Sequence, residues 1–306
     1  MNTAASTLRA QLASDELIIC PGVQDGLSAR VCLAEGFKTL YMTGAGTSAV
    51  HLGQPDLSLL TPDDMVRTAT LLTSVCPPTV PVIADCDTGY GGPLMVRRTV
   101  QRYIRAGVAG LHIEDQMLDS KRCGHLMHKI LAPVDVFVAR IRAAVAARKE
   151  LGSELVIIAR TDALQSEGFE GAVKRLRAAV EAGADVVFLE GMTSLEEMGR
   201  VTEVMAPTPC LLNMVGGGVT PLVDGETARR LGFKVVIWPC FAMTAALVAY
   251  RAAAAELKGT GMLRDTVDGE TGRVVGGIRD VFEVCGLEEA VAFDREVGGA
   301  AFAEGA

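Results

Sequence analysis

Short runs of consecutive apolar residues alternate along the chain with longer stretches in which apolar residues recur every three or four positions. The runs that predict strands occupy residues 17–23, 39–45, 80–87, 110–116, 155–162, 184–191, 208–215 and 234–240. Helical periodicity is found near residues 26–35, 62–76, 93–106, 134–151, 168–182, 194–205, 224–231 and 241–258. Apolar strands that alternate with helices are typical of a parallel sheet buried on both faces.

The same junction between helix and strand recurs along the chain. A helical stretch ends, one glycine follows, and a short apolar run begins, as at Gly36, Gly107, Gly183 and Gly232. Glycine suits this place because a helix often ends in a residue with left-handed backbone. Eight such units predict a (β/α)8 barrel of the α/β class. A doubly wound open sheet is the lesser alternative, since no GxGxxG motif follows the first strand.

The two ends of the chain lie outside this repeat. Residues 7–14 predict a short helix, residues 260–280 are rich in glycine and charge, and residues 281–297 carry an amphipathic run. We expect one barrel domain over residues 1–306. The segment 260–306 either covers the bottom of the barrel or packs on another subunit.

Composition and charge exclude several classes of protein. The net charge is −8 with no basic block, which argues against nucleic acid or an anionic membrane surface as partner. No apolar run approaches 20 residues, and the alanine-rich, mixed polar N-terminus does not resemble a signal peptide. The eight cysteines include no CxxC pair. We therefore expect a cytoplasmic protein without disulfides.

Carboxylates gather at the predicted C-terminal ends of the strands, where the catalytic groups of a barrel lie. Asp85 and Asp87 are two residues apart and point the same way from one strand, and Glu114 ends the next. Single acids often cap helices or pair with cations. Three this close repel one another unless a cation or proton intervenes, and their oxygens suit Mg²⁺ with retained waters. The set predicts a metal site.

Other strand ends carry groups that can bind an anion. Arg160 offers a planar guanidinium to a carboxylate, and a salt bridge to Glu190 or Asp162 is an alternative use compatible with the first. Residues 44–46 (Gly-Ala-Gly) could present backbone N–H groups to an oxygen. Glycines 216–218 could approach a phosphate or form a mobile lid, and the lid is favoured.

The loop after the fourth strand, KRCGH at residues 121–125, sets a thiol among cationic side chains. Positive charge stabilises a thiolate, so Cys123 is a candidate reactive residue, and a buried structural cysteine is the alternative. Zinc binding by Cys123, His125, His128 and His112 is disfavoured. The spacing is poor for a structural site, and the neighbouring acids suit a harder metal.

Several motifs together resemble the isocitrate lyase / phosphoenolpyruvate mutase superfamily. They are KRCGH, ADCDTGYGG (84–92), HIEDQ (112–116), IIARTDA (157–163), YMTGAG (41–46), GQPD (53–56) and LEG (189–191). The resemblance extends from about residue 21 to the C-terminus. The cysteine and histidine of KRCGH are typical of its lyase branches. The chain as a whole is most similar to the 2,3-dimethylmalate lyase and oxaloacetate acetylhydrolase branches, and then to 2-methylisocitrate lyases.

The resemblance implies a metal site, a substrate site and an assembly. Mg²⁺, with Mn²⁺ as a substitute, would be held by Asp85, Asp87 and Glu114 largely through water, with Asp56 nearby. The residues implied to meet the substrate are Tyr41, Thr43, Gly44, Ala45, Gly46, Asp85, Gly124, Arg160, Glu190, Asn213 and Thr220. The eighth helix would be exchanged between partners in a homotetramer, a dimer of dimers, which would give the tail its role.

The implied reaction is cleavage of the C2–C3 bond of a 2-hydroxy dicarboxylate into a 2-oxo acid such as pyruvate and a carboxylic acid. Cys123 would protonate the carbanion as general acid, so it must start as a thiol. Lys121, Arg122 and His125 would balance the charge. Tyr41 and Glu190 complete the implied catalytic set.

Several alternatives stay open to different degrees. Oxaloacetate acetylhydrolase chemistry, which gives oxalate and acetate, would need a hydrated 2-oxo group. Phosphoenolpyruvate mutase or carboxyphosphonoenolpyruvate phosphonomutase chemistry is disfavoured by Cys123 and His125. A Schiff-base aldolase is disfavoured because no predicted strand end carries lysine. A non-catalytic scaffold is disfavoured because the metal acids and the cysteine are all present. Gly216 stands where these relatives usually carry an acid, so the identity of the substrate is open.

Overall fold

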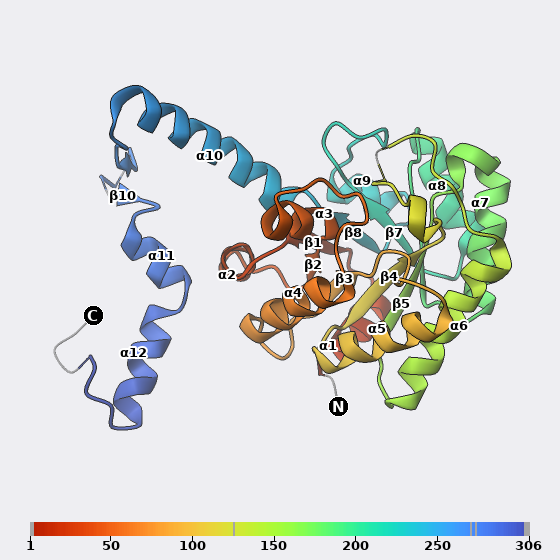
Figure 1. Ribbon diagram of the computed structural model, residues 1–306, viewed down its shortest axis with the longest axis horizontal. Coiled ribbons are helices and arrows are strands. Elements are labelled where there is room, and N and C mark those ends of the chain that lie inside the picture. The colour runs from red at the N-terminus through yellow and green to blue at the C-terminus, as the bar shows by residue number, and fades with distance from the viewer. Residues whose placement is uncertain (1–2, 125, 270, 273, 303–306) are drawn as a thin grey trace.

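The computed structural model describes residues 3–124, 126–269, 271–272 and 274–302. Eight parallel strands close into a barrel, in which each strand pairs with the next along the chain and β8 pairs with β1 (Figure 1). The strands are β1 (Ile18–Val23), β2 (Leu40–Met42), β3 (Val82–Asp85), β4 (Gly110–Glu114), β5 (Val156–Thr161), β6 (Val186–Leu189), β7 (Cys210–Asn213) and β8 (Val235–Trp238). The expected (β/α)8 fold is confirmed.

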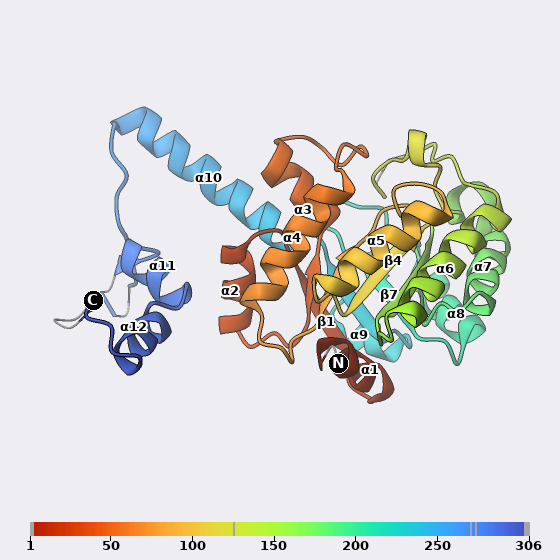
Figure 2. The same ribbon diagram turned by 60° about the horizontal axis from the view of Figure 1, so that its bottom comes forward.

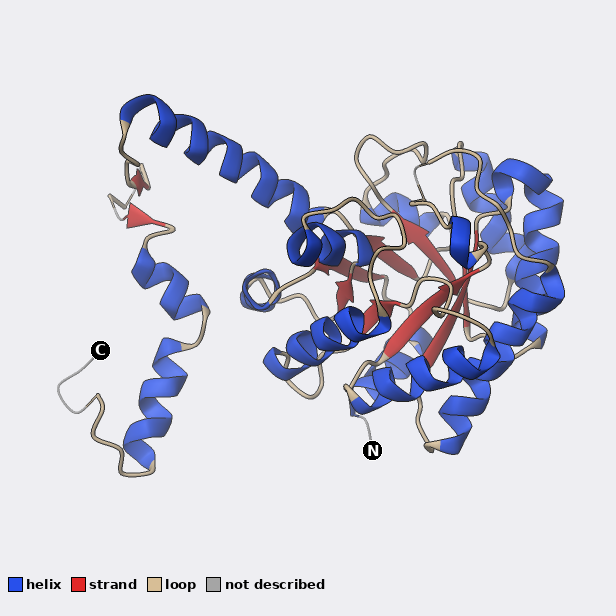
Figure 3. Ribbon diagram, viewed as in Figure 1, coloured by secondary structure: helices blue, strands red, loops and turns tan. Residues whose placement is uncertain are grey.

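Helices follow the strands and surround the barrel (Figure 3). They are α1 (Thr3–Ala13), α2 (Gly26–Ala34), α3 (Gly44–Thr47), the π-helical turn η1 (Ser48–Leu52), α4 (Pro62–Val75), α5 (Pro93–Arg105), the 3₁₀ turn η2 (Leu118–Ser120), α6 (Val134–Glu150), α7 (Leu164–Glu181), α8 (Leu195–Met205) and α9 (Gly225–Arg230). Beyond the barrel lie α10 (Phe241–Thr260), an antiparallel pair β9 (Thr266–Val267) and β10 (Val274–Val275), α11 (Ile278–Val284) and α12 (Leu287–Glu296). In the described part of the chain, no helix combines the length and apolarity that crossing a bilayer requires.

The second strand is shorter than its apolar run suggests. A strand was expected over residues 39–45, but β2 ends at Met42 because Thr43 begins a helix instead. The backbone N–H of Gly46 donates to the side-chain oxygen of Thr43 at 3.3 Å, which caps α3. The Gly-Ala-Gly segment therefore starts a helical turn at the barrel rim.

The N-terminal helix closes the bottom of the barrel. Ala5 and Leu8 of α1 are fully buried. Leu8 packs so closely on Gly110 of β4 that a Cβ there would lie 2.9 Å from its Cδ2 atom. This end of the barrel is thus covered by α1 rather than by the segment after residue 260.

The helix that follows β8 leaves the barrel instead of packing along it. None of the residues of α10 is buried, and Figures 1 and 2 both show this helix pointing away toward α11 and α12. On the barrel, Ile19 of β1 and Leu27 and Val31 of α2 remain 41%, 48% and 40% exposed. Within the described residues, these three apolar side chains of the barrel and the apolar side chains of α10 therefore stay partly exposed, although α11 lies near α2.

Candidate active site

The carboxyl ends of the parallel strands meet at one rim of the barrel, and the predicted acids lie there. Asp85 ends β3, Glu114 ends β4, and the register pairs Glu114 with Arg160 of β5. Asp87 follows with a left-handed backbone (φ 52°), and its N–H donates to Oδ1 of Asp85 at 2.8 Å. The strand ends bring together three acids and the arginine that the sequence indicated.

Burial makes these acids costly to ionise. Desolvation raises the pKa of Glu114 and of Asp87, and the charge of Asp85 raises the latter further. Lys121 offsets part of this cost, because its Nζ lies 2.8 Å from Oδ1 of Asp56 and 3.1 Å from Oδ2 of Asp87. Burial opposes the charge of Lys121, but the surrounding carboxylates outweigh it and hold its pKa well above the usual value.

The oxygen donors of this set fit a divalent cation such as Mg²⁺. Positive charge would offset the cost of ionising Glu114 and Asp87, and carboxylates are the ligands that Mg²⁺ prefers. Within the described ranges, no three His, Cys, Asp or Glu side chains converge closely enough to bind an ion directly. This agrees with an ion that keeps several waters between itself and the acids.

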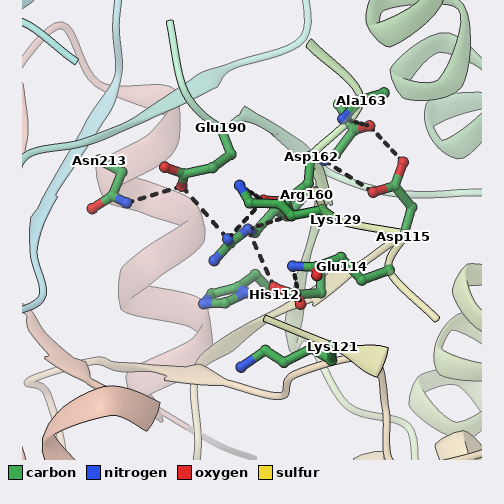
Figure 4. Close-up of polar contacts among 12 residues, drawn as sticks. His112, Glu114, Asp115, Lys121, Lys129, Arg160, Asp162, Ala163, Glu190 and Asn213 are labelled. Atoms are coloured by element: carbon green, nitrogen blue, oxygen red, sulfur yellow. Dashed lines mark hydrogen bonds and ion pairs between the residues drawn. The ribbon is translucent and has the colours of Figure 1, made fainter. Parts of the chain in front are cut away.

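Arg160 is enclosed by three carboxylates (Figure 4). Its Nε and Nη2 donate to the two oxygens of Asp162 at 3.0 and 3.1 Å. Nε also lies 3.2 Å from Oε2 of Glu114, and Nη2 lies 3.7 Å from Oε2 of Glu190. The guanidinium carbon sits 5.0 Å from the centre of the Phe188 ring. The salt bridges considered for Arg160 are present, and the side chain still lines the cavity.

The KRCGH loop folds over this rim and brings its thiol to the cavity. Cys123 is half-buried and lines the cavity. The next residue, Gly124, rests on the pair formed by Arg160 and Glu190. A Cβ on Gly124 would lie 2.8 Å from Nη2 of Arg160 and 3.1 Å from Cδ of Glu190. Glycine at this position lets the loop approach the arginine closely.

Arg122, another residue of this loop, does not line the cavity. The side chain of Arg122 is exposed, and its Nη1 donates to the carbonyl of Met127 at 3.1 Å. The backbone of Arg122 is held by Gln116, which donates to its carbonyl at 2.9 Å and accepts from its N–H at 3.0 Å. His125, which the sequence indicated as a catalytic residue, lies outside the described residues.

Tyr41 lines the cavity from below and is hydrogen-bonded to a buried histidine. Its Oη lies 2.7 Å from Nε2 of His112, which is fully buried. Burial raises the pKa of Tyr41 and lowers that of His112 to about 4, so both are neutral near pH 7. The sequence had given His112 no catalytic role. His112 lies two residues before Glu114 on the same strand, so both side chains point into the barrel. This spacing could have identified His112 as part of the site.

The segment after β2 supplies a wall of the cavity and touches the acids. Thr43 and Ala45 line the cavity, as the resemblance implied. Gly44 lies against Asp85, because a Cβ there would be 2.5 Å from Oδ2. A Cβ on Gly46 would likewise lie 2.5 Å from the methyl carbon of Thr43. Glycine at both positions permits this approach.

The strand-seven side contributes an amide and an open loop. Nδ2 of Asn213 donates to Oε2 of Glu190 at 3.0 Å, and its buried Oδ1 has no hydrogen-bond partner among the described residues. Thr220 is not among the residues that line the cavity. Gly216 is exposed, and a Cβ there would meet no atom within 4 Å. The loop therefore has room for a side chain that this chain does not carry.

The cavity has about 440 Å³ of empty space, including its open mouth, and its lining combines polar and apolar side chains. The polar lining residues are Tyr41, Thr43, Asp56, Asp85, Arg160 and Asn213. The sulfur-bearing and apolar lining residues are Cys123, Cys240, Phe188, Val215, Ile237 and Pro239, with Ala45 and Gly124 completing the wall. Sequence reasoning missed Phe188, Ile237 and the lining residues after β7 and β8. Because these residues lie in or just after predicted strands, their position in the sequence could have identified them as lining residues.

Comparison with known proteins places the chain in a family. The phosphoenolpyruvate phosphomutase family model matches residues 8–258. The 2,3-dimethylmalate lyase of Eubacterium barkeri is 42% identical over 239 residues, which are 78% of this chain and 80% of that protein. The 2-methylisocitrate lyase of Aeropyrum pernix is 39% identical over 261 residues, 85% of this chain and 82% of that protein.

Solved structures agree with these relatives. A 2,3-dimethylmalate lyase, described as a PEP mutase/isocitrate lyase superfamily member, superimposes with a TM-score of 0.93 and 50% identity, over 100% of this chain and 99% of that chain. An oxaloacetate acetylhydrolase with the inhibitor 3,3-difluorooxalacetate superimposes with a TM-score of 0.92 and 49% identity, over 98% of this chain and 99% of that chain. A phosphonopyruvate hydrolase complex with oxalate and Mg²⁺ superimposes with a TM-score of 0.82 and 26% identity, over 96% of this chain and 99% of that chain. The resemblance read from the motifs is confirmed.

Proposed function

Because this chain belongs to the PEP mutase/isocitrate lyase superfamily and is one of its carbon–carbon lyases, we propose that it cleaves the C2–C3 bond of an alkyl-substituted 2-hydroxy dicarboxylate. The substrate is of the 2,3-dimethylmalate or 2-methylisocitrate type. The products are a 2-oxo acid such as pyruvate and a carboxylic acid. The observation that carries the proposal is the mixed lining of the cavity, where the guanidinium of Arg160 and the amide of Asn213 occur together with apolar side chains.

The polar and the apolar lining residues suit the two kinds of group on such a substrate. The guanidinium of Arg160 pairs with a carboxylate, and the buried acceptor of Asn213 suits a hydroxyl group. The side chains of Phe188, Val215 and Ile237 suit alkyl substituents.

The metal proposed for the site is Mg²⁺, with Mn²⁺ as a substitute. Asp85, Asp87 and Glu114 would hold it largely through water, with Asp56 nearby. Support comes from the buried carboxylates and from the relative that binds Mg²⁺ with oxalate. When bound, the ion supplies positive charge that stabilises the oxygen of the 2-oxo product.

The chain's own residues position the substrate and supply the proton. Arg160 binds the C1 carboxylate, and the neutral phenol of Tyr41 hydrogen-bonds the 2-oxygen. A base takes the proton of the 2-hydroxyl group, and the C2–C3 bond breaks to give the 2-oxo acid and a carboxylate-stabilised carbanion. The thiol of Cys123 then protonates the carbanion. Lys121, two residues earlier, lends positive charge to the resulting thiolate. Glu190 belongs to the same set, because it pairs with Arg160 and accepts a hydrogen bond from Asn213.

A substrate panel tests the proposal. The purified protein is assayed with Mg²⁺ against 2,3-dimethylmalate, 2-methylisocitrate, unsubstituted malate and oxaloacetate. We expect a 2-oxo acid from one of the alkylated hydroxy acids and much slower turnover of malate. Release of oxalate and acetate from oxaloacetate, without cleavage of any hydroxy acid, would overturn it.

Oxaloacetate acetylhydrolase remains the second candidate, because that structure is nearly as similar to this chain as the dimethylmalate lyase structure is. Phosphonate chemistry has less support. The phosphonopyruvate hydrolase structure is only 26% identical to this chain. The panel separates these candidates when phosphonopyruvate is added to it.

We also propose that a second copy of the chain completes the barrel. The uncovered α10 of one copy would lie against the exposed strip formed by Ile19, Leu27 and Val31 of the other. On this view each chain is one barrel domain whose segment 260–306 serves assembly, in a homotetramer built from two swapped dimers. A cytoplasmic location stays a prediction.

A further inference from the structure

Arg160 is shared among three carboxyl groups. Asp162 accepts two of its hydrogen bonds, at 3.0 and 3.1 Å, and Glu114 and Glu190 approach to 3.2 and 3.7 Å. A cation shared among several carboxylates creates little net attraction for a further anion, because their fields oppose its own. The arginine needs help if it is to bind a substrate carboxylate.

Lys129 provides that help from the same loop that carries the thiol. Its Nζ lies 2.5 Å from Oδ1 of Asp162, and the side chains of the pair are 5% and 0% exposed. The same Oδ1 also accepts from Nη2 of Arg160, so the two cations share one carboxylate oxygen. Figure 4 shows the side chain of Lys129 extending toward Arg160 and Asp162.

The other two carboxyl groups around Arg160 have neutral hydrogen-bond partners, and Glu114 also feels the charge of Lys121 at longer range. Glu190 accepts from Asn213 at 3.0 Å and Glu114 from Gln116 at 3.0 Å. Among the described side chains, Asp162 is the one of these three carboxylates with a second cation within ion-pair distance. The metal proposed above would serve Glu114 instead.

A purely structural explanation of the buried lysine is weaker. Backbone contacts already secure this limb of the loop, because Met117 donates to Ile130 at 2.8 Å and Ala132 to Asp115 at 2.7 Å. Asp162 is itself fixed by Arg160 and by its own N–H, which donates to Asp115 at 2.9 Å. Burying the ammonium group of a lysine costs free energy. Because the contacts above already hold the loop and Asp162 in place, a structural role alone does not account for this cost.

We propose that Lys129 is a positioning residue that neutralises Asp162, so that the guanidinium of Arg160 keeps its positive charge for an anionic ligand. The ligand is the substrate carboxylate if the proposed function holds. The role concerns the electrostatic potential at the cavity, which can be measured without substrate or metal.

Cys123 offers a probe of that potential, because it lines the same cavity and adjoins Gly124, which rests on Arg160. Alkylation rates at Cys123 are measured by mass spectrometry with iodoacetate, an anion, and with neutral iodoacetamide. The ratio of the two rates reports local charge, whereas a change in loop exposure alters both rates together. Cys285 is exposed on the distant C-terminal segment and serves as the internal control.

Lys129→Gln removes the charge but keeps a hydrogen-bond donor, and Lys129→Arg keeps the charge. We expect Lys129→Gln to lower the iodoacetate-to-iodoacetamide ratio at Cys123 about three- to tenfold, and Lys129→Arg to leave it near the wild-type value. The double variant Lys129→Gln/Asp162→Asn removes both charges and should restore most of the ratio. Lys129→Met gives a second charge-removing variant if the glutamine variant folds poorly.

Oxalate binding with Mg²⁺ gives the second readout by calorimetry. Lys129→Gln should weaken it about ten- to a hundredfold, with recovery in the double variant. An unchanged alkylation ratio in Lys129→Gln, or no recovery in the double variant, overturns the role of Lys129. Absence of oxalate binding in the wild type counts against the proposed function alone, because the alkylation ratio still decides the inference.

Discussion

The ammonium group of Lys121 lies 2.8 Å from Oδ1 of Asp56, although the two residues are 65 positions apart in the chain. Asp56 comes from the segment between η1 and α4, and Lys121 begins the loop that carries Cys123. The same ammonium group reaches Asp87 at 3.1 Å. One buried cation therefore joins the thiol loop, the rim after β2 and the acids after β3.

Replacing Lys121 should cost both stability and activity. Lys121→Met leaves Asp56 and Asp87 without their nearest cation, and breaking a buried ion pair costs about 3 kcal/mol or more. We expect a lower free energy of unfolding in denaturant and a fall in turnover. Lys149→Met, at an exposed position on α6, is the matched control and should change neither. Unchanged stability of the Lys121 variant would contradict the pairing.

Replacing Cys123 tests the proton donor. Cys123→Ser keeps the shape but offers a much weaker acid, so turnover should fall about 10²–10⁴-fold with little change in stability. Cys285→Ser at an exposed position provides the control. Near-normal turnover of the true substrate by the Cys123 variant would remove this residue from the mechanism.

Gly44 should be intolerant of any side chain. A Cβ there would lie 2.5 Å from Oδ2 of Asp85, so Gly44→Ala must displace this acid. We expect weaker Mg²⁺ binding, measured by calorimetry, in a protein that still folds. Gly259→Ala, where a Cβ meets no atom within 4 Å, should bind Mg²⁺ as the wild type does. Equal affinities in the two variants would argue that Asp85 takes no part in holding the ion.

Metal binding should depend on pH above the range of ordinary carboxylates. Burial raises the pKa of Glu114 and Asp87, so protons compete with the cation until the pH exceeds these raised values. Affinity should fall as the pH is lowered, and binding should release protons at pH values above the range in which an ordinary carboxyl group titrates, near 4. Calorimetry in buffers of different ionisation enthalpy measures this release. Binding that releases no protons above that range would contradict the raised pKa values. Chelation with EDTA should abolish turnover, and Mg²⁺ or Mn²⁺ should restore it.

The uncovered face of α10 should matter for assembly. Val248 on this helix is 70% exposed, so Val248→Asp has no buried partner to lose within one chain. If α10 packs against a second copy, this variant should lower the mass observed by light scattering. Arg251→Ala, at an exposed position on the same helix, lowers the net charge by the same one unit and is the matched control. A wild-type protein that is monomeric at micromolar concentration would exclude the exchange.

Much of this arrangement could be read from the amino-acid sequence. Continuous apolar runs alternate with helical periodicity along the chain. Few folds can hydrogen-bond the backbone of such segments and also bury their side chains, so this pattern determined the barrel. Because parallel strands end at the same rim, Asp85, Asp87, Glu114 and Arg160 could be assigned to one site from their positions after apolar runs. Motifs such as KRCGH identified the family.

The tertiary structure alone decided which groups meet across long sequence separations. Loop paths and side-chain directions, which no local pattern encodes, decide these contacts. Examples are the pairing of Lys121 with Asp56, the contact of Lys129 with Asp162 and the apolar lining at Val215. The departure of α10 from the barrel is of the same kind, because its apolar side chains do not show which chain covers them. Local periodicity sets where backbone elements form, whereas contacts between their ends depend on how the closed barrel places them in space.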